Sequence, residues 1–195
     1  MGKKLAAYDS TSAAAIKPII AFYDSVTSPP PGDASTVEIT DAQWQTCLSQ
    51  QGQWGVSGDA LAQVPPPTTA QQLASAQAEQ IARVDSACAM EICAGFASSA
   101  LGQLHGYPSK PTDQQNLSAS VLASLIPNRP AGWTTSFWCA DSNGVWAYRE
   151  HTAEQIQQVG MDGKAAISAS IARKIQLEQQ IMAAATVDAI KQIVW

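Results

Sequence analysis

One short segment of this 195-residue chain holds the residue types that covalent catalysis would need. His151 lies close in sequence to Cys139, Asp141 and Glu150, the residue types from which a Cys–His hydrolase is built. A nucleophilic cysteine is normally presented at a helix start or a sharp turn, where its thiolate is stabilised. Cys139 instead lies inside a predicted strand. We therefore expect it to be a core residue, and we expect the protein not to be an enzyme.

The other possible metal ligands and cofactor motifs are scattered or missing. The cysteines and histidines are Cys47, Cys88, Cys93, Cys139, His105 and His151, and no two cysteines have C-x-x-C spacing. Cys88 and Cys93 are five positions apart on a predicted helix, so they point in different directions. The chain has no glycine-rich phosphate loop, no HExxH and no GxSxG motif. We expect no metal site and no cofactor, and we expect His105 to cap the end of a helix.

Aromatic side chains are concentrated in residues 132–152, which hold three of the six tryptophans. Three interpretations are open for Trp133, Trp138 and Trp146: the core of a small hairpin domain, a protein interface, or a surface that stacks on sugar rings. The core interpretation comes first, because a few tryptophans must replace many aliphatic side chains in so small a unit. The candidate interface or hairpin-core aromatics are Trp44, Trp54, Trp133, Phe137, Trp138, Trp146, Tyr148 and Trp195.

The element that must position most of these aromatics is a β-hairpin. Asn143-Gly144 is a strong turn signal and predicts that residues 135–141 pair with residues 145–150. Side chains alternate between the two faces of a strand, so Cys139 and Trp138 are expected on opposite faces.

Long alanine-rich helices are predicted on both sides of the hairpin. The first begins at Thr69, which has capping-box spacing with Gln72, and is expected to continue to about residue 104, as one helix or two. Its apolar stripe consists of Ile81, Val84, Cys88, Ile92 and Phe96. The second begins at Thr152, and we expect Gly160 and Gly163 to interrupt it. Its apolar stripe consists of Ile167, Ile171, Ile175 and Ile181.

The amino-terminal third reads as a small α+β unit. Strands are predicted over residues 19–25 and 37–39, followed by a helix capped by Thr40 and Gln43 and a hairpin over residues 54–64. The proline cluster of residues 64–69 is the best domain boundary. We therefore expect an α+β fold in three parts, with an amino-terminal unit (1–64), a proline spacer and long helical segment (65–105), and a Trp-rich hairpin with helices (106–195).

Composition excludes several classes of partner. The net charge is −5 and the 11 Lys and Arg residues are spread thinly, so no basic stripe is available for nucleic acid. No apolar stretch approaches the ~20 residues that span a bilayer, and the amino terminus lacks the apolar core of a secretion signal. We expect a soluble protein made in a cytoplasm.

Two parts of the chain resemble proteins of tailed bacteriophages. The segments "IIAFYDSV" and "VEITDAQWQTCLSQQGQWGVSGDALAQVPPP" resemble the amino-terminal region of tail fibre assembly proteins and related fibre proteins. In these, an I-T-D-x-x-W helix start and a W-x-V-x-x-x-x-L hairpin run into a proline pair. Residues 107–195, with "GWTTSFWCADSNGVWAYREHT", resemble a carboxy-terminal domain of unknown function common in phage and prophage tail genes.

The resemblance implies a non-enzymatic tail protein. The first hypothesis is a virion component, made in the bacterial host cytoplasm and present in several copies, that attaches or decorates fibre or baseplate proteins in the virion tail. Its partners would be other phage tail or fibre proteins. The alternative is an assembly chaperone that leaves before the virion matures, and a third class is a host-surface glycan-binding module or a Cys–His hydrolase.

Overall fold

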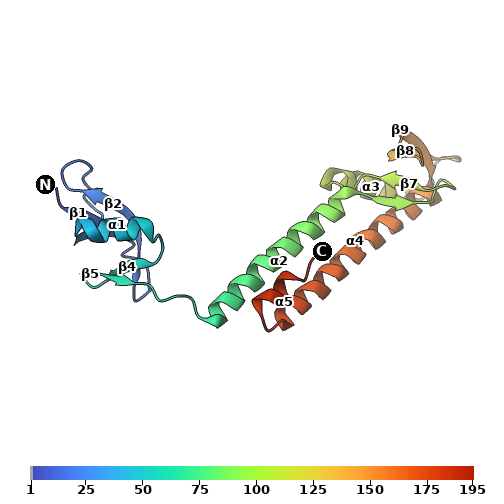
Figure 1. Ribbon diagram of the computed structural model, residues 1–195. Helices are drawn as coiled ribbons and strands as arrows, with labels where there is room; N and C mark the ends of the chain where they lie inside the picture. Colours follow the sequence, from blue (N-terminus) through green and yellow to red (C-terminus); the bar gives the residue numbers. More distant parts are fainter. Residues whose placement is uncertain (1) are drawn as a thin grey trace. The chain divides into compact units, whose positions relative to one another are not determined.

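A computed structural model describes residues 2–195 and divides the chain into two compact units, one ending at Thr68 and one beginning at Thr69 (Figure 1). The fold is α+β, as predicted, with an antiparallel sheet in each unit. The division differs from the three expected parts, because the long helix after the proline spacer belongs to the carboxy-terminal unit. This helix packs against another helix of that unit, and Val84 and Cys88 of its apolar stripe are buried. None of the described helices has the length and apolar character needed to cross a bilayer.

The amino-terminal unit is a five-stranded antiparallel sheet with one helix, in the strand order β3-β1-β2-β4-β5. Its elements are β1 (Lys4–Tyr8), β2 (Lys17–Asp24), β3 (Thr36–Ile39), α1 (Asp41–Ser49), β4 (Trp54–Ser57) and β5 (Ala60–Gln63). The predicted strands, the helix between them and the hairpin are all present. A small core of Ala6, Val37, Ile39 and Val56 lies under them, with Trp44 packed against it.

The start of α1 shows why the local sequence dictates this element. Gln43 donates its backbone N–H to Thr40 Oγ1 at 3.1 Å, and the Thr40 backbone N–H is bonded to Gln43 Oε1 at 2.8 Å. Each residue thus satisfies one amide that the first helical turn leaves without a partner. The predicted capping box is confirmed.

The carboxy-terminal unit combines a four-stranded antiparallel sheet, in the order β6-β7-β8-β9, with a pair of long helices. Its elements are α2 (Thr69–Ala94), β6 (Phe96–Ser98), β7 (His105–Tyr107), α3 (Pro111–Ser124), β8 (Thr134–Ala140), β9 (Trp146–Thr152), α4 (Ala153–Ala183) and α5 (Val187–Lys191). Helices α2 and α4 run side by side in opposite directions (Figure 1). One core lies between the sheet, α3 and α4, and a second lies where α2, α4 and α5 meet.

The predicted end of the first long helix is wrong. Helix α2 stops at Ala94 because Gly95 adopts φ +115°, a backbone conformation that residues with a side chain adopt only under strain. The chain then forms β6, which carries Phe96 into the sheet core. His105 lies in β7 and donates its Nδ1–H to Gln103 O at 2.9 Å, so it does not cap a helix.

The expected interruption of the second long helix is also wrong, since α4 is continuous from Ala153 to Ala183. A methyl group on Gly160 would lie 2.8 Å from Val121 Cγ2, and one on Gly163 would lie 2.8 Å from Phe96 Cζ. Both glycines therefore give neighbouring elements room to approach α4. This packing offsets the ~1 kcal/mol that each glycine costs a helix relative to alanine.

The two predicted apolar stripes differ in how far they are buried. Val84 and Cys88 on α2 are buried, as expected for a packing face. On α4 the buried member is Ile181, whereas Ile171 and Ile175 are exposed. They lie beside the face that meets α2, to which Leu177 and Ile181 belong, because one neighbouring helix covers only a narrow strip of α4.

Candidate functional site

The histidine that could have served as a catalytic base is sealed in the core of the carboxy-terminal unit. His151 is fully buried on β9, and its two ring nitrogens are both engaged. Nδ1–H donates to Arg149 O at 2.8 Å, so Nε2 accepts the hydroxyl of Tyr107 at 2.9 Å. Burial lowers the pKa of His151 and raises the pKa of Tyr107, so both groups are neutral near pH 7. This pair acts as a structural polar contact.

Cys139 and His151 both adjoin the buried Tyr107 hydroxyl, whereas Asp141 and Glu150 have partners of their own. Cys139 is fully buried on the inner face of β8, in agreement with its prediction as a core residue. The backbone N–H groups of Val145 and Asn143 donate to the Asp141 carboxylate and hold its pKa below the usual range, and Arg149 forms an ion pair with it at 3.0 Å. Glu150 accepts the hydroxyl of Thr134 at 2.6 Å at the exposed side of the hairpin.

The cysteines and histidines occupy separate places. Cys47 lies on α1, Cys88 is buried on α2, and Cys93 is exposed near the end of the same helix. Within residues 2–195, no three His, Cys, Asp or Glu side chains lie close enough together to hold a metal ion.

The aromatic residues of the hairpin divide between its two faces. Phe137 is buried against α4, and Trp133 packs at the edge of the same core. Trp138, Trp146 and Tyr148 lie on the outer face, where they are 40%, 45% and 71% exposed. The first interpretation of Trp138 and Trp146 as core residues is therefore wrong. The alternation along the strands is as predicted, but the helices pack against the face that carries Phe137 and Cys139.

The three exposed rings form one cluster. Trp138 stacks on Trp146 with 6.1 Å between the ring centroids and 20° between the planes. Tyr148 lies opposite Trp138 on the neighbouring strand, 4.9 Å away and tilted by 57°. We call Trp138, Trp146 and Tyr148 the outer aromatic cluster. Rings fixed against one another lose little conformational freedom on binding, which suits a recognition surface.

The remaining candidate aromatics are each held by local partners. Trp44 lies 5.3 Å from Phe22, beneath the ammonium group of Lys4. Trp54 donates its indole N–H to Gln50 Oε1 at 2.8 Å. Trp195 packs at the α2–α5 core, with the Arg173 guanidinium 4.8 Å from its ring centroid.

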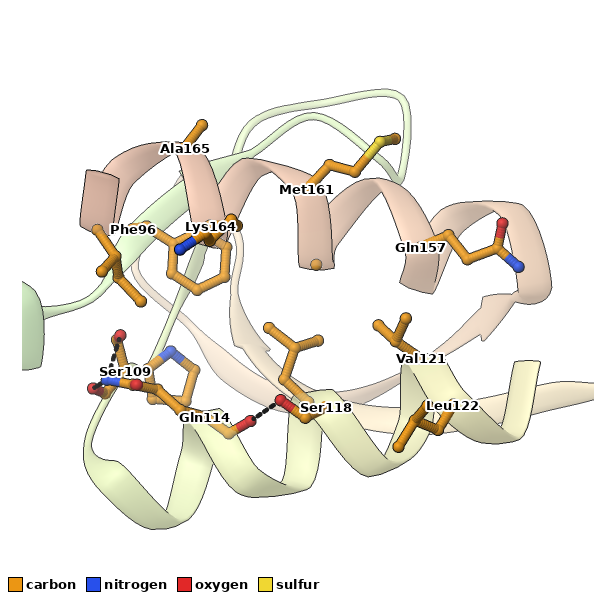
Figure 2. Close-up of a pocket in the computed structure, with 15 residues that line it drawn as sticks. Phe96, Ser109, Gln114, Ser118, Val121, Leu122, Gln157, Met161, Lys164 and Ala165 are labelled. Carbon is orange, nitrogen blue, oxygen red and sulfur yellow. Dashed lines mark hydrogen bonds between the residues drawn. The ribbon is translucent and has the colours of Figure 1, made fainter. Parts of the chain in front are cut away.

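A large apolar groove runs between α3 and α4, and sequence reasoning missed it. It encloses about 830 Å³ and is lined by Phe96, Pro108, Ser109, Gln114, Leu117, Ser118, Val121, Leu122, Gln157, Gly160, Met161, Gly163, Lys164, Ala165 and Ile167. Figure 2 shows Val121 and Leu122 on the α3 side, with Met161 and Lys164 on the α4 side. We call this the α3–α4 groove.

The two glycines that the sequence presents as helix breakers line the groove. Gly160 and Gly163 leave the surface of α4 without side chains where Val121 and Phe96 approach it. On either side, Leu122 and Met161 are 66% and 60% exposed. Lys164 is the one charged side chain of the lining, and it forms no ion pair with any residue that the structure describes. Small residues three apart in a helical pattern are the signal that could have indicated a close approach.

Comparison with known proteins identifies a family. A family model described as "Domain of unknown function (DUF4376)" matches residues 75–194, which include the α3–α4 groove and the outer aromatic cluster. No curated protein and no solved structure matches the chain.

Proposed function

We propose that this chain, which belongs to the family described as "Domain of unknown function (DUF4376)", is a non-enzymatic protein that binds other polypeptides. The resemblance of residues 1–64 to tail fibre assembly proteins and related fibre proteins suggests the partners. In this proposal the chain is a virion component, present in several copies, that attaches or decorates the fibre or baseplate proteins of a tailed phage.

The observation that carries the proposal is the α3–α4 groove. An open apolar channel with exposed Leu122 and Met161 at its borders is the geometry in which an amphipathic helix buries its apolar face. The unpaired ammonium group of Lys164 favours an acidic side chain on the same helix. The proposed occupant is therefore an apolar helical segment of a tail or fibre protein that carries a carboxylate.

The buried Tyr107–His151 pair supports a binding role over hydrolysis. A general base must reach a substrate proton, and His151 is enclosed with both nitrogens engaged. Cys139 is enclosed on the same face of the hairpin.

Substitution of Met161 by glutamate tests the proposal. A carboxylate in the groove repels the acidic group of the partner and must be desolvated on binding, so we expect association to weaken at least ~10-fold, about 1.4 kcal/mol. The measurement is recovery of the chain in purified phage particles by mass spectrometry, together with pull-down of tail and fibre proteins from infected cells.

Met182→Glu is the matched control. Met182 lies on the same helix and is equally exposed at 60%, but it is outside the groove lining. Equal incorporation of the Met161→Glu and Met182→Glu chains would contradict the proposed groove. Binding in the lysate without any chain in mature particles would favour the assembly chaperone.

A further inference from the structure

A second hollow lies on the opposite flank of α3, facing the outer side of the β8–β9 hairpin. It encloses about 490 Å³ and is lined by Pro108, Asp113, Asn116, Ala119, Ser120, Ser136, Phe137, Trp138 and Tyr148. Asp113, Asn116 and Ser120 recur every three or four residues, so they share one face of the helix. We call this the outer hollow. Its size lies within the usual range of small-molecule sites, roughly 300–1,000 Å³.

One wall of the outer hollow is aromatic. Trp138 and Tyr148 are a cross-strand pair whose ring centroids lie 4.9 Å apart, and both rings remain exposed. Trp146 stacks on Trp138 and supports its orientation. An indole face beside a tilted phenol presents an apolar surface with polar edges, against which the C–H face of a pyranose ring can pack.

The opposite wall is polar and belongs to α3. Asp113 Oδ2 accepts the backbone N–H of Lys110 at 3.0 Å, which orients the carboxylate. The Asn116 amide is exposed and forms no hydrogen bond with any described residue. An amide both donates and accepts, and a carboxylate accepts through two oxygens. Together with the hydroxyls of Ser120 and Ser136, they can bond to adjacent hydroxyl groups of a sugar.

The charge of the hollow selects among sugars. Asp113 is the one charged side chain of its lining, and no lysine or arginine lines it. A carboxylated sugar would face repulsion from Asp113, whereas a neutral sugar would not.

From these features we infer that the outer hollow binds a neutral hexose or N-acetylhexosamine unit. Its apolar face lies on Trp138 and Tyr148, and its hydroxyls bond to Asn116 and Asp113. This site shares only Pro108 with the α3–α4 groove and does not depend on the proposed function.

Saturation-transfer NMR and tryptophan fluorescence titration of the full chain test this inference, with maltose, lactose, methyl mannoside and chitobiose as probes. We expect at least one of these neutral sugars to bind saturably in the millimolar range, and we expect sialyllactose not to bind better than lactose. Asn116→Ala should weaken binding at least ~10-fold, because its loss leaves sugar hydroxyls without partners.

Gln115→Ala is the matched control, since it removes the neighbouring exposed amide on α3, which does not line the hollow. It should bind like the unaltered chain, and so should Met161→Glu, which separates this site from the α3–α4 groove. Absence of binding by all four neutral probes would overturn the inference. Sugar binding by Asn116→Ala equal to that of the unaltered chain would also overturn it. A third contrary result is that Asn116→Ala no longer associates with a tail protein while no sugar binds to the unaltered chain.

Discussion

Replacing Gly95 with alanine is expected to destabilise the carboxy-terminal unit by about 3 kcal/mol. Gly95 adopts φ +115°, which an L-residue with a side chain enters only under strain. A methyl group there would also lie 2.5 Å from the backbone oxygen of Tyr107. That oxygen belongs to β7, so relief of the contact must move the β6–β7 pair.

Gly102→Ala separates the two contributions. Gly102 also has a positive φ, +87°, but a methyl group there meets nothing within 4 Å. Only backbone strain applies, so its cost should be about 1–2 kcal/mol. Hydrogen exchange with mass spectrometry, recorded at increasing urea concentrations, measures the free energy of unfolding of each unit separately. An equal loss of unfolding free energy in the two variants would show that the contact with Tyr107 O adds nothing to the effect of Gly95→Ala.

Gly95 also marks the limit of what local pattern predicts about α2. The apolar spacing through Val84 and Cys88 correctly predicts a packed helix. The same spacing extends to Phe96, and this continuity concealed the helix end, although glycine is the usual residue just after a helix. Phe96 is apolar because β6 contributes to the sheet core, so one pattern passes through two elements.

The hairpin shows a second limit. The Asn-Gly turn and the alternation of side chains are local properties, and both predict the hairpin correctly. Which face becomes the core depends on where α3 and α4 pack, and that information lies in distant segments. The core interpretation of Trp138 and Trp146 therefore fails, and Phe137, Cys139 and His151 occupy the core.

The walls that α3 contributes to both candidate sites are beyond local prediction for the same reason. Both flanks of α3 become walls only when α4 and the hairpin come to lie beside it. Asn116 and Asp113 read in the sequence as ordinary polar residues of a helix start. Gly160 and Gly163 read as helix breakers, because the partner that requires their small size, Val121 or Phe96, lies far away in the chain.

Acid is expected to destabilise the carboxy-terminal unit through His151. Burial lowers the pKa of this imidazole below its ordinary value of 6.5 in the folded chain. At any pH between the folded and unfolded values, the unfolded chain binds a proton that the folded chain does not. Stability is therefore complete above pH 6.5 and falls as pH decreases below it, by at most about 1.4 kcal/mol per pH unit.

His151→Gln provides the comparison. Its side-chain amide can reach the position of Nε2 beside the Tyr107 hydroxyl, and it does not titrate. The free energy of unfolding, measured in urea at several values between pH 7.5 and 5, should lose its slope in this variant. A flat profile in the unaltered chain would contradict the expected shift, and an equal slope in His151→Gln would assign it to another group.

The same imidazole distinguishes a structural from a catalytic histidine. A catalytic base must exchange protons with a substrate, so it must be accessible and have a pKa near the working pH. His151 fails the first condition, because the Tyr107 hydroxyl and Arg149 O occupy its nitrogens in a closed core. Diethyl pyrocarbonate should therefore modify His151 only at the rate at which the unit unfolds. Rapid modification in the folded chain would reopen the hydrolase hypothesis.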